Sequence, residues 1–242
     1  DESRGLGDVY KRQLDKQVLK FFRLKPKKRA NLNPWKKITK IVLNTKKSVN
    51  IAIIGKYVNL KDAYKSLDEA LVHGGIANNV KVNLIRIESD NLKNSEIKIK
   101  LKNVSGLLIP GGFGKRGTEG KISAIKYARE KKIPFLGICF GMQMAIVEFA
   151  RNKLKIKNAG SSELDKKCYP VIGLINEWDK NGKIINGTDK NLGGTMRLGL
   201  YEAKLRNNSA INKIYKSKNI RERHRHRSVS YTHLRAHETR LN

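Results

Sequence analysis

Apolar runs alternate with amphipathic segments through the middle of the chain. The run Val-Asn-Ile-Ala-Ile-Ile-Gly at 49–55 ends in glycine and is typical of a buried strand. Residues 80–87 alternate between apolar and polar positions, which predicts a further strand. The remaining pattern predicts buried strands at 104–112, 133–139 and 171–175, and helices at 63–74, 118–132 and 140–154.

The order of these elements predicts the fold class. Strands that alternate with helices favour a mostly parallel sheet covered on both faces. We therefore expect an α/β protein with a flavodoxin-like layered fold. The preceding residues 14–48 are rich in lysine and interrupted by Pro26 and Pro34, so they predict a helix end followed by a linker.

Length and composition narrow the class of protein. The 242 residues, 39% of them hydrophobic, allow one packed domain with a tail or linker. No apolar run approaches the roughly 20 residues that span a bilayer, and no signal peptide opens the sequence. Two cysteines do not make a disulfide framework. We expect a soluble, cytoplasmic protein with no membrane partner.

The formal charge of +31 raises the question of nucleic-acid binding. Lysine outnumbers arginine 36 to 16, and asparagine and isoleucine are also abundant. All three abundant residues have A/T-rich codons, and the positive charge is spread along the chain. The composition therefore indicates an A/T-rich genome, and we expect no nucleic-acid partner.

The two ends of the chain share an unusual feature. Residues 7–13 and 229–234 can be encoded by one short DNA element read in opposite orientations. That element resembles a transposon end used as a sequencing adapter. We therefore interpret 1–13 and 228–242 as artefactual flanks that make no extensive core contacts. The histidines at 233 and 237 then carry no functional information.

The motif with the clearest chemistry is Leu-Gly-Ile-Cys-Phe-Gly-Met-Gln at 136–143. A predicted strand turns here into a predicted helix, and Gly137 and Gly141 remove Cβ groups that would clash in a tight turn. This is the pattern of a nucleophile elbow with sulfur in place of a hydroxyl. A helix N-terminus favours the thiolate, so we expect Cys139 to be a nucleophile rather than a buried core cysteine. Cys168 lacks this context and is expected to be structural or incidental.

A second motif, Ile-Pro-Gly-Gly-Phe-Gly-Lys-Arg-Gly at 109–117, also follows a predicted strand. It should therefore lie at the same edge of the sheet as Cys139. Glycine-rich backbone there can direct N–H groups at a developing oxyanion. A phosphate-binding loop is the rival interpretation, but the Gly-Lys-Ser/Thr ending of a P-loop is absent. A plain tight turn is the third possibility.

The third motif is Arg-Glu-Arg-His-Arg-His-Arg at 221–227. One of its arginines could hold a carboxylate through two hydrogen bonds. A solvated basic strand or an RNA-binding patch fits the same residues. The residues alone leave this choice open.

These motifs, together with Leu-Gly-Gly-Thr-Met-Arg-Leu-Gly at 192–199, closely resemble the CTP synthase family in residues and order. The cysteine motif alone marks the wider class I, or triad, glutamine amidotransferases. The resemblance covers roughly 49–227. It implies a glutamine amidotransferase domain there, incomplete at its C-terminus, and it implies that 14–48 is the end of an amidoligase domain and the interdomain linker.

The resemblance implies roles for individual residues. Cys139 would attack the side-chain amide of L-glutamine, and the backbone of Gly112 and Phe140 would form the oxyanion hole. Glu163 would hold the substrate α-amino group and Arg227 the substrate carboxylate. The full glutamine-binding set implied is Gly112, Phe140, Gly141, Met142, Gln143, Glu163 and Arg227, with no metal ligand.

For the whole enzyme, the resemblance implies ammonia transfer to an amidoligase domain that aminates UTP with ATP and Mg²⁺, with GTP as effector, in a homotetramer. The sequence also departs from the family. The His-Pro-Glu motif that carries the family's base is absent, so we expect this chain to be inactive by itself. The alternative function is a non-catalytic basic binding module on a related fold, with Cys139 structural or redox-sensing.

Overall fold

The computed structural model describes residues 17–25, 31–58, 60–90, 92–174, 177–180, 183–186, 197–226 and 228–230. The chain divides into two compact units, 1–46 and 47–242. The described part of the first unit contains helix α2 (Asn33–Asn44), where a linker was expected. Pro34 lies in the first turn of this helix, where a missing N–H costs no hydrogen bond, so it starts the helix instead of breaking it.

The second unit is built on a parallel sheet, as predicted. Its four strands run in the order β2-β1-β3-β4, and every neighbouring pair is parallel. They are β1 (Ser48–Gly55), β2 (Lys81–Glu88), β3 (Gly106–Ile109) and β4 (Phe135–Gly137). β1 and β3 are central and apolar, so Ile53, Leu107 and Ile109 are almost fully buried.

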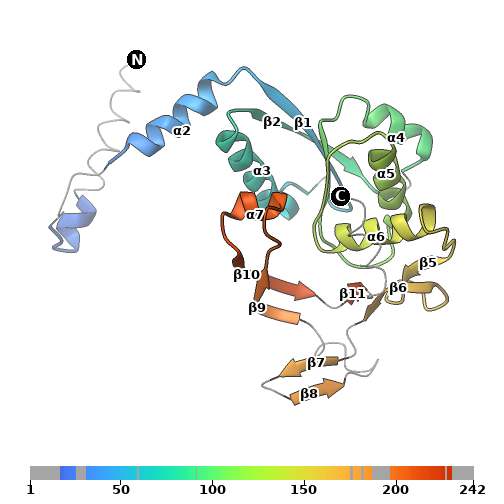
Figure 1. Ribbon diagram of the computed structural model, residues 1–242. Coiled ribbons are helices and arrows are strands. Elements are labelled where there is room, and N and C mark those ends of the chain that lie inside the picture. Colours follow the sequence, from blue (N-terminus) through green and yellow to red (C-terminus); the bar gives the residue numbers. More distant parts are fainter. Residues whose placement is uncertain are drawn as a thin grey trace. The chain divides into compact units, whose positions relative to one another are not determined.

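Helices flank this sheet (Figure 1). They are η1 (Lys61–Tyr64), α3 (Lys65–Ala77), α4 (Asn94–Lys100), α5 (Thr118–Glu130) and α6 (Phe140–Asn152). α3 contacts β2, while α5 packs against both α4 and α6 on the other side of β1 and β2 in the view. Buried apolar residues of α5 and α6, such as Ile125 and Met144, join those of the strands in one core. Among the described residues, no helix combines the length and apolar character needed to cross a membrane.

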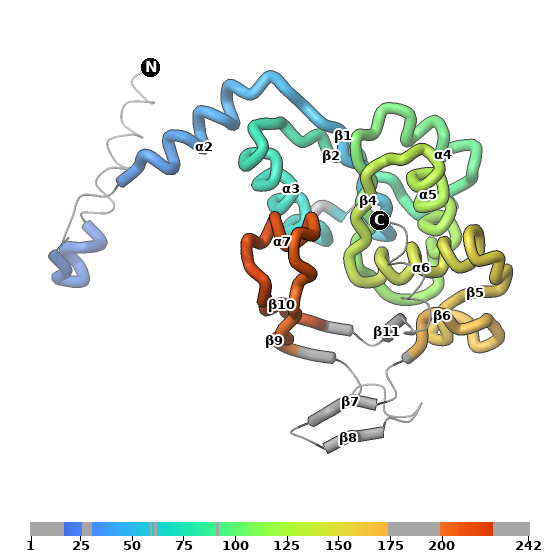
Figure 2. Tube along the Cα trace, viewed as in Figure 1, coloured from blue at the N-terminus to red at the C-terminus, as the bar shows by residue number. Residues whose placement is uncertain are grey.

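Smaller sheets follow α6 in the chain (Figure 2). β5 (Ala159–Ser161), β6 (Tyr169–Leu174) and β11 (Ser228–Ser230) form one sheet, and β7 (Glu177–Lys180) pairs with β8 (Lys183–Asn186). β9 (Arg197–Lys204) and β10 (Asn219–His226) form an antiparallel pair joined through α7 (Ala210–Tyr215).

The start of the predicted C-terminal flank takes part in one of these sheets. Ser228–Ser230 pairs with β6, with Val229 opposite Gly173. This is backbone pairing at the edge of a small sheet, and the expectation that 228–242 makes no extensive core contacts stays a prediction. The predicted flank 1–13 and the stretch 231–242 lie outside the described residues, and the adapter origin of both flanks stays a prediction.

One predicted strand is less buried in the structure than the sequence indicated. Residues 133–139 were expected to form a buried strand, but β4 is only three residues long, and Leu136 is 55% exposed. β4 pairs with β3 on one side and is the last strand of its sheet. An apolar run does not distinguish such an edge strand from a central one.

Candidate active site

Cys139 lies between the end of β4 at Gly137 and the start of α6 at Phe140. Its φ of +52° lies in the left-handed region, which non-glycine residues rarely adopt. A Cβ on Gly137 would come within 2.6 Å of the Gly141 carbonyl carbon, and a Cβ on Gly141 within 2.1 Å of the Ile109 carbonyl oxygen. Both glycines are therefore required by the backbone, and the strained turn has the geometry of a nucleophile elbow.

The glycine-rich loop lies beside this turn, at the same edge of the sheet. A Cβ built on Gly111 would lie 3.5 Å from the Cys139 Cβ. Successive Cα atoms are about 3.8 Å apart, so the Gly112 Cα also lies within about 9 Å of that atom. A Cβ at Gly112 would meet nothing within 4 Å, so open space adjoins its backbone.

Three influences act on the Cys139 thiol. Burial raises its pKa, the nearby Glu163 carboxylate raises it further, and the Phe140 backbone N–H lowers it by hydrogen bonding to the sulfur. The Phe140 N–H, at the start of α6, favours the thiolate as expected, but burial and Glu163 outweigh it, so the net pKa of Cys139 is raised. The groups acting on the thiol include no cation, and a base must take its proton for it to react.

The predicted substrate-binding residues fall in two places. Phe140, Gly141 and Gln143 are buried in the first turn of α6, while Met142 is 46% exposed. Glu163 follows β5, and its backbone N–H donates to Ser161 Oγ at 3.3 Å. Its carboxylate is close enough to Cys139 to contribute to the raised pKa of that thiol.

Arg227 lies outside the described residues, as does most of the 192–199 motif. The residues before Arg227 form β10, which pairs with β9 and places Arg221 beside Glu202 in a surface ion pair. The His224 ring lies against Tyr201, with ring centroids 5.3 Å apart. The described part of the motif is thus a basic strand packed on its neighbour.

Two buried lysines beside Phe140, the residue after Cys139, were not predicted from the sequence. Lys56, directly after β1, is 7% exposed, and Lys121 of α5 is 1% exposed. Their Nζ atoms lie 6.0 and 5.0 Å from the centre of the Phe140 ring. Lysines directly after a buried strand or within an apolar helix face were the available signal, but they were hidden among the chain's many surface lysines.

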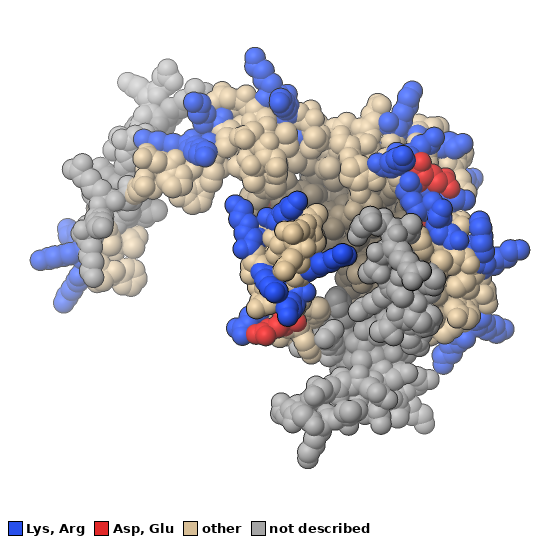
Figure 3. Space-filling model, in the orientation of Figure 1, with Lys and Arg blue, Asp and Glu red and all other residues tan. Residues whose placement is uncertain are grey.

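The other lysines and arginines on the face shown in Figure 3 are scattered over several elements and form no single stripe. A cavity of about 690 Å³ lies between α4, α5, α6 and β5, and Cys168 lines it but Cys139 does not. The elbow geometry and the neighbouring glycine loop make Cys139, rather than Cys168, the candidate nucleophile. Among the described residues, no group of His, Cys, Asp or Glu is arranged to hold a metal ion.

Comparison with known proteins agrees with this geometry. Residues 59–239 match the family model described as glutamine amidotransferase class-I. The chain is 76% identical over 218 residues to a CTP synthase of Pelagibacter ubique (strain HTCC1062), covering 90% of this chain and 40% of that protein. It is 51% identical over 217 residues to a CTP synthase of Zymomonas mobilis, covering 88% of this chain and 40% of that protein.

A solved structure described as the glutaminase domain of Trypanosoma brucei CTPS with bound acivicin is also similar. Its TM-score is 0.66 at 32% sequence identity, and the match covers 78% of this chain and 72% of that one. The chain spans about 40% of the length of the curated relatives it matches.

Proposed function

Because the chain belongs to the class I glutamine amidotransferase family, among the glutaminase domains of CTP synthases, we propose that Cys139 is its glutamine-hydrolysing nucleophile. The observation that carries this proposal is the position of Cys139 at a strained strand-to-helix turn, with Gly111 packed against it. A cysteine that only filled the core would need neither the positive φ nor the two flanking glycines.

The proposed reaction has two steps. Cys139 Sγ attacks the side-chain amide carbon of glutamine, giving a tetrahedral intermediate with a negatively charged oxygen. The N–H groups of Gly112 and Phe140 donate to that oxygen. The intermediate collapses to a γ-glutamyl thioester as the proton given up by the thiol passes to the nitrogen, which leaves as ammonia, and water then hydrolyses the thioester to glutamate and returns the proton to the thiol.

The remaining contacts to glutamine are proposed from the family resemblance and from the position of each residue. The Phe140–Gln143 turn borders the nucleophile and would line the pocket around the amide. Glu163 carries negative charge close to Cys139, which suits a substrate α-ammonium group. Arg227 is proposed as the partner of the substrate carboxylate.

For the full-length protein we propose the complete reaction of a CTP synthase. The ammonia passes to an amidoligase domain, where ATP and Mg²⁺ activate UTP for amination, and GTP acts as effector. That chemistry belongs to a domain outside this chain, and no step of glutamine hydrolysis runs through it. We also propose a homotetramer in the cytoplasm.

The test is the nitrogen source used by the full-length protein. Cys139→Ala should abolish CTP formation from glutamine, because the nucleophile is lost. The same variant should keep ammonia-dependent CTP formation within about twofold of wild type, because the amination site lies in another domain. Loss of both activities by a folded variant, or retention of the glutamine-dependent one, would overturn the proposal.

A further inference from the structure

The glycine-rich loop at 110–117 is tied to the body of the domain by one buried side chain. Lys56 directly follows β1, and its ammonium group donates to two consecutive carbonyls of the loop. The acceptors are the carbonyl oxygen of Phe113 and that of Gly114, the latter at 2.9 Å. Since a buried ammonium is costly without hydrogen bonds, these carbonyls also account for the stability of the lysine at this position.

Apart from these hydrogen bonds, features of the loop itself do little to hold it in one conformation. Phe113 is 55% exposed, so the loop gains little from packing its largest side chain. Gly114 and Gly117 have φ values of +77° and +69°, and glycine loses more conformational freedom on ordering than other residues. The next carbonyl, of Lys115, accepts a hydrogen bond from Thr118 Oγ1 at 2.7 Å. Three consecutive carbonyls of the loop are therefore held.

Holding these carbonyls constrains the amides nearby. A trans peptide is planar, with its C=O and N–H pointing in opposite directions, so holding the Phe113 and Gly114 carbonyls fixes the N–H groups of Gly114 and Lys115 and restricts the backbone just before them. The Gly112 N–H lies two peptides before the held Phe113 carbonyl. On the N-terminal side of that amide, Gly111 packs against Cys139. The Gly112 amide lies between these two fixed points.

We propose that Lys56 is a positioning residue for glutamine hydrolysis, which holds the glycine loop so that the Gly112 N–H is directed at the oxyanion formed on Cys139. This inference rests on the proposed function of Cys139. Lys56 does not touch the reacting atoms, and it acts through the backbone that it anchors. Its effect belongs to the transition state, because the oxyanion forms only there.

Charged side chains near Lys56, among them Asp90 and Arg116, also act on the loop. Lys121 lies in α5, which follows the loop in the sequence. The ammonium groups of both Lys56 and Lys121 lie over the Phe140 ring. Asp90 supplies compensating negative charge and also pairs with Arg116 of the loop at 3.0 Å. Lys56 thus holds the loop at the Phe113 and Gly114 carbonyls, and Asp90 holds it at the Arg116 side chain.

The experiment compares Lys56→Met with wild type in the full-length protein. Met keeps the length and apolar stem of lysine but cannot donate hydrogen bonds. Loss of one oxyanion donor costs about 10²–10³ in kcat, so a misdirected donor should lower the glutaminase kcat about 10- to 100-fold. The KM for glutamine should stay within about threefold. Lys56→Arg, which keeps the donors, should recover part of the lost kcat.

Two further measurements separate positioning from a general structural role. Ammonia-dependent CTP formation should be unchanged in Lys56→Met. Alkylation of Cys139 by iodoacetamide should also be unchanged, because direct alkylation forms no oxyanion. The matched control is Lys126→Met, which removes an exposed lysine from α5 and should leave every value unchanged.

Each outcome decides the inference. A kcat for Lys56→Met within threefold of wild type would overturn it. So would a parallel loss of ammonia-dependent activity, or failure of the variant to fold, because either would make Lys56 a structural residue. If wild type itself shows no Cys139-dependent glutaminase activity, the proposed function fails instead.

Discussion

Three features of its surroundings act on the proton of the Cys139 thiol. Burial and the Glu163 carboxylate both disfavour the thiolate, and the Phe140 N–H favours it. A carboxylate beside a nucleophilic thiol is a disadvantage for the free protein. It becomes useful when it holds the α-ammonium of glutamine, because the ligand then cancels its charge. On this argument Glu163 couples substrate binding to activation of the thiol.

Glu163→Gln tests that coupling in the absence of glutamine. Removing the carboxylate takes away one cause of the raised pKa, so the pKa of Cys139 should fall. It should remain above the ordinary value for a thiol, because burial is the larger cause. The measurement is the pH dependence of iodoacetamide alkylation, followed on the peptide that contains Cys139. The midpoint should lie at lower pH in Glu163→Gln than in wild type.

The control for this prediction is Glu119→Gln, which removes a carboxylate that pairs with Arg151 at the protein surface. It should leave the alkylation midpoint in place. A midpoint that stays unchanged in Glu163→Gln would show that the carboxylate does not act on the thiol.

The residues of the site differ in how far the sequence predicted them. Cys139 and its two glycines were predicted because a strand-to-helix turn without Cβ groups has few explanations. Lys56 was not predicted, because its role depends on which loop carbonyls reach it in three dimensions. The raised pKa of Cys139 was also missed, since the helix N-terminus is visible in the sequence while burial and the approach of Glu163 are not.

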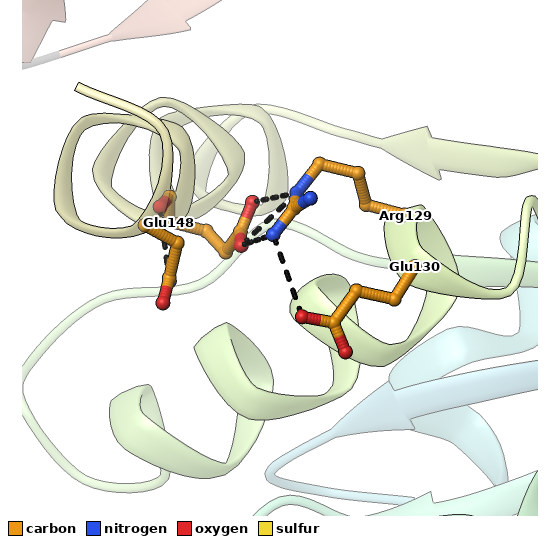
Figure 4. A network of polar contacts seen from close by, with 4 residues as sticks. Arg129, Glu130 and Glu148 are labelled. Carbon is orange, nitrogen blue, oxygen red and sulfur yellow. Dashed lines mark hydrogen bonds and ion pairs between the residues drawn. The ribbon is translucent and has the colours of Figure 1, made fainter. Parts of the chain in front are cut away.

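At the scale of elements, α5 and α6 are joined by a buried ion pair (Figure 4). Arg129 of α5 donates from Nε and Nη2 to the Glu148 carboxylate of α6, at 2.8 to 3.2 Å. The Glu148 side chain is only 1% exposed, whereas that of Arg129 is 31% exposed. The hydrogen bonds to Glu148 raise the pKa of Arg129. This pair fixes α6, and therefore the elbow at its N-terminus, against α5.

Arg129→Met should destabilise the protein by roughly 3 kcal/mol, because it leaves the Glu148 carboxylate buried without its partner. Arg129→Met/Glu148→Met should recover most of that loss, since no buried charge remains. Urea unfolding of the two variants and wild type gives the free energies of unfolding. Equal stability of the single and double variants would contradict a buried-charge penalty at Glu148.

Elements were predicted best where the chain repeats its pattern over a full length. β1, α5 and α6 lie close to their expected ranges, because each buries a regular apolar face in the same core. α4 was missed because its seven residues include a single buried apolar position, Ile97. The exposure of β4 could not be predicted, because it depends on which strand ends the sheet.

At the scale of the whole molecule, the described residues include the proposed nucleophile Cys139 but no His-Pro-Glu motif. The five histidines of the sequence include none in a His-Pro-Glu motif. Of these, His224 belongs to the basic strand β10 and packs on Tyr201. On the proposed mechanism, this chain would supply the nucleophile and the oxyanion hole without the histidine base expected from the family resemblance.

The absence of the His-Pro-Glu motif leads to a prediction about the activity of this chain. The 242-residue chain should release no glutamate from glutamine at a rate that depends on Cys139. Burial and the Glu163 carboxylate raise the pKa of the thiol, and the sequence lacks the His-Pro-Glu motif whose histidine would take that proton and deliver one to the leaving nitrogen. Glutamate and ammonia release would be measured for the chain, for its Cys139→Ala variant and for the full-length protein.

Covalent labelling keeps this prediction from resting on inactivity alone. A glutamine-analogue electrophile carries its own leaving group, so its reaction needs the nucleophile and pocket but no proton for ammonia. We expect it to modify Cys139 in the 242-residue chain at alkaline pH, where more thiolate is present, and glutamine to slow the modification. Labelling without turnover would place the deficit at proton transfer. Cys139-dependent turnover would show that another group serves as the base, and labelling that glutamine does not slow would favour a structural or redox role for Cys139.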